Sequence, residues 1–220
     1  MKGEHQTRVI NTRPPRLASS RHSGGSVIDV AASGRAYVDA PAVVDTSVAI
    51  GLEQMLAARE QRAARQIAAL TRFDRPLVSI TVVTPGAVKD GPLPRRVLSE
   101  ALRAMDVMCR IRRWSVLSRE VSWLGTGPEA LYAVEVASWR LKSAAVKLED
   151  RHPLGRLWDL DVIAPGQRVL SRKQLGLPAR ACLVCDRPAF ECGRSRRHPL
   201  TELMDAIDRI VKEHDRRLRG

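Results

Sequence analysis

The order of strand-like and helix-like segments between residues 77 and 170 constrains the fold more than any other feature of the sequence. Residues 77–83, LVSITVV, are β-branched and apolar, which is typical of a buried strand. Residues 114–124 and 130–137 indicate two more strands, joined into a hairpin by a Gly-Thr-Gly-Pro turn. A further strand is predicted within residues 152–163, and a short return strand follows it. Gaps of helical length separate the first strand from the hairpin, and the hairpin from the later strand.

Amphipathic helices are predicted in both gaps, at residues 94–111 and 138–151, and another precedes the first strand at 46–70. From the first strand onward the order is therefore β-α-β-β-α-β, which is the split βαβ or ferredoxin-like arrangement. We expect an α+β fold in which an antiparallel sheet carries two helices on one face, with the N-terminal helix added. In that arrangement the first and last strands lie side by side at the centre of the sheet.

Composition divides the chain into three parts. Residues 1–45 are rich in Arg, Ser, Pro and Gly and lack periodicity, which predicts a disordered basic tail. An over-extended translation start or an organelle transit peptide would have a similar composition. Residues 46–176 form the predicted α+β core. Residues 177–220 add a Cys/His loop and a C-terminal amphipathic helix, which we expect to pack on the core.

The charge balance points to an anionic partner or ligand. Lys and Arg number 37 against 24 Asp and Glu, which gives a formal net charge of +13. Nucleic acid, a polyphosphate and an acidic protein all fit such a charge, and so does an Arg-rich composition with no particular target. Aromatic residues make up only 4% of the chain, which argues against a base-stacking nucleic-acid binder. The sequence contains no apolar run that could span a membrane and no secretory signal, so we expect a cytoplasmic protein with reduced thiols.

Two carboxylates mark the predicted strand in residues 152–163, HPLGRLWDLDVI. Because side chains alternate along a strand, Asp159 and Asp161 share one face, roughly 7 Å apart, while Arg156 points to the other face. A carboxylate pair on an apolar strand repels itself and needs water or a cation. Oxygen ligands of this kind suit Mg²⁺ or Mn²⁺. A solvated edge strand that binds nothing would show the same spacing.

The C-terminal part contains a C-x2-C-x6-C-x5-H pattern formed by Cys182, Cys185, Cys192 and His198. Three thiols and an imidazole can bind a structural Zn²⁺ tetrahedrally, and the first C-x2-C pair suits a zinc knuckle. The gap of six residues is short for a zinc ribbon. Buried or redox-inert thiols, or a catalytic cysteine, are the alternatives.

Four stretches together resemble one family: REQRAARQ at 59–66, SITVVTPGAVKD at 79–90, LEDRHPLGRLWDLDV at 148–162, and the Cys/His pattern as far as HPLTEL. Over about residues 50–215 the chain resembles the apo-citrate lyase phosphoribosyl-dephospho-CoA transferases, also called holo-citrate lyase synthases. The resemblance implies a nucleotidyltransferase that acts on the acyl carrier (gamma) subunit of citrate lyase. Such an enzyme takes the prosthetic group from 2′-(5″-triphosphoribosyl)-3′-dephospho-CoA, attaches it to a serine and releases diphosphate.

The resemblance also suggests roles for individual residues. Asp159 and Asp161 would hold Mg²⁺, and one of them or a metal-bound hydroxide would help to deprotonate the acceptor serine. The expected ligands of the triphosphate are basic residues, with Arg the better bidentate partner: Arg156, Lys89, and the pair Arg95 and Arg96 in the first turn of a helix, where an anion would offset their unfavourable position. His152 could orient a phosphate or act as a base, although it could equally be a turn residue beside Pro153.

The net positive charge suits both an anionic donor and an acidic carrier protein. The same chemistry on the carrier subunit of another lyase or decarboxylase is an alternative, because fold and motif do not distinguish acceptors. A non-enzymatic nucleic-acid-binding module is a further alternative, since RNA-recognition domains share the topology. Against it, the predicted strands lack the aromatic-rich motif of those domains.

Overall fold

The computed structural model describes residues 48–220, and the predicted tail at 1–45 lies outside this range. Five strands form one sheet in the order β2-β3-β1-β4-β5, and every neighbouring pair is antiparallel. The strands are β1 (Leu77–Val82), β2 (Ser115–Ser122), β3 (Glu129–Glu135), β4 (Trp158–Ala164) and β5 (Arg168–Leu170). The predicted α+β class with an antiparallel sheet is therefore confirmed. The first strand lies beside the acidic strand, as expected, with Ser79 opposite Asp161 and Thr81 opposite Asp159.

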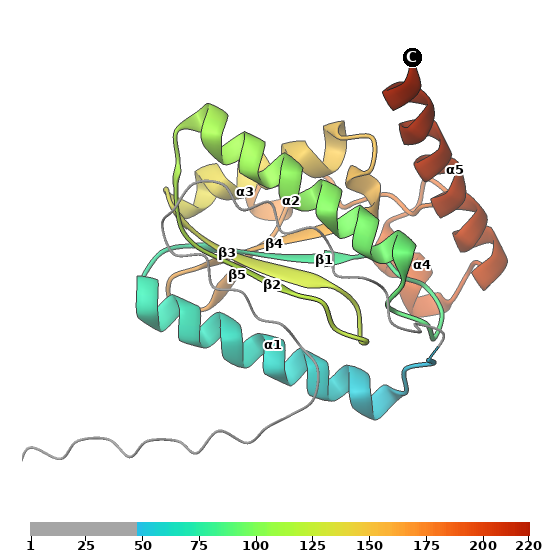
Figure 1. Cartoon of the computed structure of the whole chain (residues 1–220), viewed down its shortest axis with the longest axis horizontal. Helices are drawn as coiled ribbons and strands as arrows, with labels where there is room; N and C mark the ends of the chain where they lie inside the picture. Colours follow the sequence, from blue (N-terminus) through green and yellow to red (C-terminus); the bar gives the residue numbers. More distant parts are fainter. Residues whose placement is uncertain (1–47) are drawn as a thin grey trace, which may run out of the picture.

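Helices cover both faces of this sheet. Figure 1 shows α2 (Pro92–Arg112) and α3 (Ser138–Arg151) on one face, and α1 (Leu52–Phe73) across the other. The alternation along β1 explains this arrangement, because Val78 and Ile80 join the larger core under α2 and α3. Leu77 instead packs with Leu70 of α1 in a smaller core. The sequence thus supplies one apolar face for the helix pair and a second, smaller one for the N-terminal helix.

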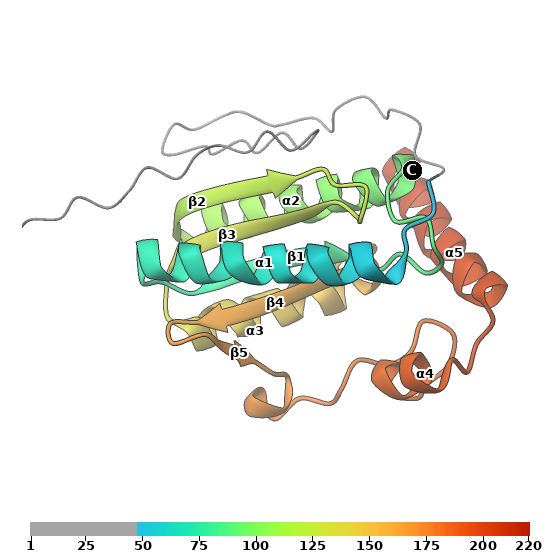
Figure 2. The ribbon, with the colours of Figure 1, turned by 90° about the horizontal axis from the view of Figure 1, so that it is seen from below.

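The C-terminal part lies at one end of the sheet. Short 3-10 turns occur at η1 (Gly155–Leu157) and η2 (Lys173–Leu175), and the helices here are α4 (Ala189–Ser195) and α5 (Leu200–Arg219). Figure 2 shows α4 and α5 together beyond the end of the sheet where β4 begins. Ile207 of α5 is buried in the larger core, so this helix packs on the α/β body. None of the described helices is long and apolar enough to cross a membrane.

The prediction that the strand within residues 152–163 includes Arg156 was wrong. The strand begins at Trp158, and Arg156 lies in the η1 turn, so its direction does not follow from strand alternation. Gly155 makes this turn possible, because a Cβ there would lie 2.6 Å from the carbonyl oxygen of Leu148 and even closer to that of Glu149. The His-Pro-Leu-Gly stretch is therefore a tight connection between α3 and β4.

Candidate functional site

The acidic pair lies on β4 as the alternation predicted. Trp158 and Leu160 are buried on the side of α2 and α3, whereas Asp159 and Asp161 are exposed on the opposite side. Partial desolvation raises the pKa of Asp161, and the like charge of Asp159 raises it further, while Lys142 opposes both effects. Two acceptor-only carboxylates that repel each other on one exposed face fit a hard divalent cation such as Mg²⁺.

Side chains complete the outer edge of β4 where β5 does not reach. The pairing with β5 covers only residues 162–164. Leu160 N–H donates to Glu149 Oε1 at 2.9 Å, and Lys142 Nζ donates to the Leu160 carbonyl oxygen at 3.3 Å. Arg180 Nη1 donates to the Trp158 carbonyl oxygen at 2.6 Å. These contacts satisfy the edge of β4 and fix the backbone that carries the carboxylates.

Arg180 connects three parts of the site. Its Nη2 donates to the carbonyl oxygens of Gly155 and Arg156 at 3.3 and 3.2 Å, which ties it to the η1 turn. Its Nη1 also lies 3.7 Å from Asp159 Oδ1 and 3.5 Å from Glu149 Oε1. Arg172 pairs with the same Glu149 at 2.7 Å. Sequence reasoning missed Glu149, Arg180, Arg172 and Lys142, although Lys142 and Glu149 interrupt the apolar face of the predicted helix.

A cavity of about 770 Å³ opens between the η1 turn, the end of β1 and the C-terminal part. Its charged lining consists of three guanidinium groups, those of Arg156, Arg180 and Arg196, with the single carboxylate of Asp159. Apolar side chains supply the remaining walls, among them Pro85, Phe190 and Leu203. Burial lowers the pKa of Arg156, and the neighbouring charges of Arg180 and Arg172 lower it further. Such a concentration of positive charge beside apolar walls suits an anionic ligand with an apolar portion.

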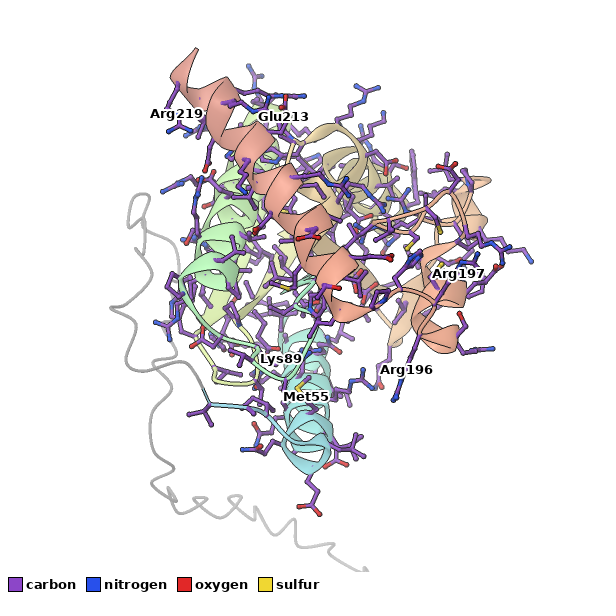
Figure 3. The ribbon with its side chains drawn as sticks, turned by 90° about the vertical axis from the view of Figure 1, so that its right-hand side faces the viewer. Met55, Lys89, Arg196, Arg197, Glu213 and Arg219 are labelled. Carbon is purple, nitrogen blue, oxygen red and sulfur yellow. The ribbon has the colours of Figure 1, made fainter. Side chains whose placement is uncertain are left out.

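The structure brings Arg156 and Asp159 together in this cavity, whereas Asp161 lies on the same strand outside its lining. Lys89, Arg95 and Arg96 do not line it either. Lys89 Nζ donates to the Thr84 carbonyl oxygen at 2.7 Å, and burial lowers its pKa. Figure 3 shows Lys89 set apart from Arg196 and Arg197 in the view onto α5.

Arg95 and Arg96 make ion pairs within the chain. Arg95 is buried and forms a two-pronged pair with Asp90, at 2.8 and 2.6 Å. Arg96 pairs with Asp215 of α5 and so joins α2 to the C-terminal helix. In this conformation the two arginines at the start of α2 have carboxylate partners from the chain itself, which offset their unfavourable position near a helix N-terminus.

His152 lies on the other side of the sheet from the carboxylates. Its ring centroid is 4.3 Å from that of Trp158 and 5.8 Å from that of His214. Nδ1 accepts a hydrogen bond from the Leu154 N–H at 3.1 Å, within the tight connection before η1. Burial lowers the pKa of His152, and His214 lowers it further. This environment favours the interpretation of His152 as a turn residue.

The four residues of the Cys/His pattern meet in space. One ligand atom from each of Cys182, Cys185, Cys192 and His198 lies within 4.8 Å of all the others. The N–H of Arg187 and the His198 ring lower the pKa of Cys185 to about 7. Burial raises the pKa of Cys192 to about 11. Cys182, Cys192 and His198 also line the cavity, so the cluster and the acidic strand belong to one region.

Comparisons with known proteins identify one family. Residues 50–214 match the model of the family described as apo-citrate lyase phosphoribosyl-dephospho-CoA transferase. A relative of that name from Citrobacter koseri is 41% identical over 170 residues, which cover 77% of this chain and 93% of the relative. A relative of the same name from Escherichia coli O7:K1 is 36% identical over 167 residues, covering 76% of this chain and 91% of the relative. The matched range contains the acidic strand, the cavity and the Cys/His cluster. The chain therefore belongs to the apo-citrate lyase phosphoribosyl-dephospho-CoA transferase family.

Proposed function

We propose that this transferase attaches the phosphoribosyl-dephospho-CoA group to apo-citrate lyase, with the acyl carrier (gamma) subunit as the acceptor. The donor would be 2′-(5″-triphosphoribosyl)-3′-dephospho-CoA and the acceptor atom a serine hydroxyl oxygen. The observation that carries the proposal is the cavity of about 770 Å³, which is lined by three arginines and Asp159 beside apolar walls. A triphosphate suits the guanidinium groups, and the pantetheine portion of the donor suits the apolar walls.

In the proposed reaction the serine oxygen forms a bond to the α-phosphorus. The bond from that phosphorus to the oxygen bridging it to the β-phosphorus breaks, and diphosphate leaves. Arg156 and Arg180 are placed to stabilise the charge on the phosphate oxygens, because both guanidinium groups line the cavity. Asp159 is the lining carboxylate and the candidate acceptor of the serine proton. This type of transfer depends on positioning and charge stabilisation more than on covalent help from the protein.

A divalent cation fits the proposal. Asp159 and Asp161 would hold Mg²⁺ or Mn²⁺, since both are exposed carboxylates on one face of β4. When bound, the cation would neutralise charge on the transferring phosphate and on the diphosphate. The ion pair distance of 3.7 Å between Arg180 and Asp159 places a cationic side chain next to this proposed metal ligand.

Intact mass spectrometry of the carrier subunit tests the reaction. The protein is mixed with Mg²⁺, the triphosphoribosyl donor and apo carrier subunit, and released diphosphate is measured in parallel. We expect the carrier to gain the mass of the prosthetic group and one diphosphate to appear for each modified carrier. Asp159→Asn and Asp161→Asn should each lower the rate by about 100-fold or more, as expected for loss of a metal ligand or base.

Asp208→Asn is the matched control, because Asp208 is an exposed carboxylate on α5 outside the cavity. It should leave the rate unchanged. If the citrate lyase carrier stays unmodified while the carrier of another lyase or decarboxylase is modified, the proposed acceptor is wrong. Full activity of both carboxylate variants would remove the proposed roles of Asp159 and Asp161.

A further inference from the structure

The Cys/His cluster sits in a segment that has almost no apolar core of its own. Among the described residues 171–205, Cys192 is the only one that is buried. The regular structure between η2 and α5 is limited to the single bridge Ala181–Pro188 and the short helix α4. A segment this exposed needs some other source of order, and a bound metal ion is one that small substructures use.

The backbone around Cys182 and Cys185 forms a tight turn, and both sulfurs lie close to Cys192 and His198. Cys182 N–H donates to the Arg187 carbonyl oxygen at 2.7 Å, and Ala189 N–H donates to that of Arg180 at 2.8 Å. The sulfurs of Cys182 and Cys185 lie within 4.8 Å of each other and of the ligand atoms of Cys192 and His198. The turn therefore brings the two cysteines of the C-x2-C pair together.

The distances within the cluster fit tetrahedral coordination. Cys185 Sγ lies 3.6 Å from Cys192 Sγ and 3.3 Å from His198 Nε2. Zinc–sulfur bonds of about 2.3 Å place two ligand sulfurs of a tetrahedron about 3.8 Å apart, so little movement is needed. The four cysteines are free thiols, and the separation of 3.6 Å between these two sulfurs is far from a disulfide bond.

A carboxylate orients the imidazole from behind. Glu202 Oε2, at the start of α5, lies 3.0 Å from His198 Nδ1. This contact holds the proton on Nδ1 and leaves Nε2, the atom nearest to the sulfurs, as the ligand atom. Metal-binding histidines commonly have such a carboxylate partner. Because Glu202 belongs to α5, the contact also links the cluster to the helix that packs on the core.

We infer that Cys182, Cys185, Cys192 and His198 bind one zinc ion, which holds the segment between Arg180 and Leu200 in place as a wall of the cavity. Four protein ligands leave no open position, so the ion is structural, and three thiolates select zinc over the magnesium proposed for the acidic pair. Arg180 and Arg196 flank the ligands and line the same cavity, so the zinc ion positions two of its three guanidinium groups. The binding of zinc does not depend on the proposed function; the binding of the donor in this cavity does.

Metal analysis of the purified protein tests this inference directly. The full chain is expressed in medium with trace zinc, purified under reducing conditions without chelator, and analysed by inductively coupled plasma mass spectrometry. We expect close to one zinc ion per chain, released when the thiols are blocked with a mercurial reagent. Protein that contains no zinc and fails to take it up under reducing conditions would overturn the inference. So would peptide mapping that finds a Cys185–Cys192 disulfide under these conditions.

Single substitutions assign the metal to these ligands. Cys185→Ser should lower the affinity for zinc by about 100-fold or more. Cys109→Ala is the matched control, because Cys109 is buried in α2 outside the cluster, and it should retain one zinc ion. Cobalt-loaded protein should show the thiolate-to-metal charge-transfer absorption and d–d bands of tetrahedral coordination. Retention of full zinc affinity by Cys185→Ser would place the metal elsewhere.

Limited proteolysis separates this inference from the proposed function. Chelation of the zinc should speed tryptic cleavage after Arg180 and Arg194 by about tenfold or more, while the sheet core stays intact. Equal cleavage rates with and without zinc would show that the ion does not order the segment. These readouts require neither donor nor carrier, so a failure of the transfer assay would leave them unaffected.

Discussion

The sheet core and the segment at 171–199 are stabilised by different kinds of contact. In the core, α2, α3 and the strands exchange apolar surface, and Trp158 and Leu141 have no exposed area. In the segment, ion pairs, backbone hydrogen bonds to arginine and the thiol–imidazole cluster take the place of apolar packing. The cavity lies between the two regions, so the core positions its carboxylate and the segment positions most of its guanidinium groups. Stability and activity should therefore respond differently to changes in the two regions.

The largest effect is expected in the core. Trp158→Ala removes a fully buried indole whose Nε1 donates to the Val97 carbonyl oxygen at 3.0 Å. We expect a loss of about 3 to 5 kcal/mol in the free energy of unfolding, measured by urea denaturation. Phe190→Ala, at an exposed aromatic residue of the segment, should change it by less than about 0.5 kcal/mol. Similar losses for both variants would show that the segment folds as part of the core.

The next effect is expected at the junction of the two regions. Glu149→Gln keeps an acceptor for the Leu160 N–H but leaves Arg172 and Arg180 without their buried carboxylate partner. Stability should fall by about 2 to 3 kcal/mol, and high salt should recover little of it because the site is buried. Asp150→Asn removes the exposed carboxylate next in sequence, which also pairs with Arg172, and should cost less than about 1 kcal/mol. Comparable losses of stability in the Glu149→Gln and Asp150→Asn variants would mean that Glu149 acts only as a surface charge.

Arg180→Lys should affect activity more than stability. A lysine keeps the charge but cannot donate at once to the carbonyl oxygens of Trp158, Gly155 and Arg156. We expect kcat/KM for carrier modification to fall about 10- to 100-fold, while the urea midpoint changes little. Arg187→Lys, at an exposed arginine of the same segment outside the cavity, is the matched control. A wild-type rate for Arg180→Lys would show that charge alone is sufficient at this position.

The half-buried His152 should produce a modest dependence of stability on pH. Burial and His214 lower the pKa of His152, so the folded protein favours the neutral ring more strongly than the unfolded chain does. The stabilisation from this neutral ring is fully present above pH about 6.5, the unfolded pKa, and is lost as pH falls through the lower folded pKa. In the His152→Gln variant, the midpoint of urea unfolding should depend less on pH between pH 7 and 5 than it does in the wild type. An unchanged slope would assign the dependence to other groups.

The smallest predicted effect is a gain in stability, in the Asp161→Asn variant. Desolvation and Asp159 raise the pKa of Asp161, so its ionised form opposes folding when no cation is bound. Above the raised pKa this penalty is fully present, and Asp161→Asn removes it. Without divalent cation the variant should unfold about 1 to 2 °C higher at pH 7, because exposed substitutions change stability by only about 0.5 kcal/mol. A variant that melts lower than wild type in the presence of chelator would contradict this account.

Periodicity predicted the parts of the molecule that apolar burial determines. The β-branched run at 77–83 became β1, and the alternation around Asp159 and Asp161 correctly placed both carboxylates on one face. These predictions succeed because each depends on residues close together in the chain. The start of β4 was not predictable in the same way, since the η1 turn depends on the close approach of Gly155 to the end of α3.

The charged parts of the site could be predicted only in part, because most of their partners are distant in sequence. Arg95 and Arg96 suggested an anion site, yet Asp90 and the distant Asp215 pair with them. Arg180 gave no signal, because one arginine in an irregular and basic segment resembles its neighbours. The cysteine spacing predicted which residues meet, since a C-x2-C pair fixes local geometry, but not that they form a wall of the cavity.

The side chains that complete the edge of β4 have a further consequence for the behaviour of the protein in a crowded cell. An open strand edge is a template on which strands of other chains can add, and this is a common start of aggregation. Here Glu149 accepts a hydrogen bond from the Leu160 N–H, and Lys142 donates one to the Leu160 carbonyl oxygen. Arg180 donates to the carbonyl oxygen of Trp158. The carboxylates can therefore face solvent from a strand near the border of the sheet, while its backbone is closed to foreign strands.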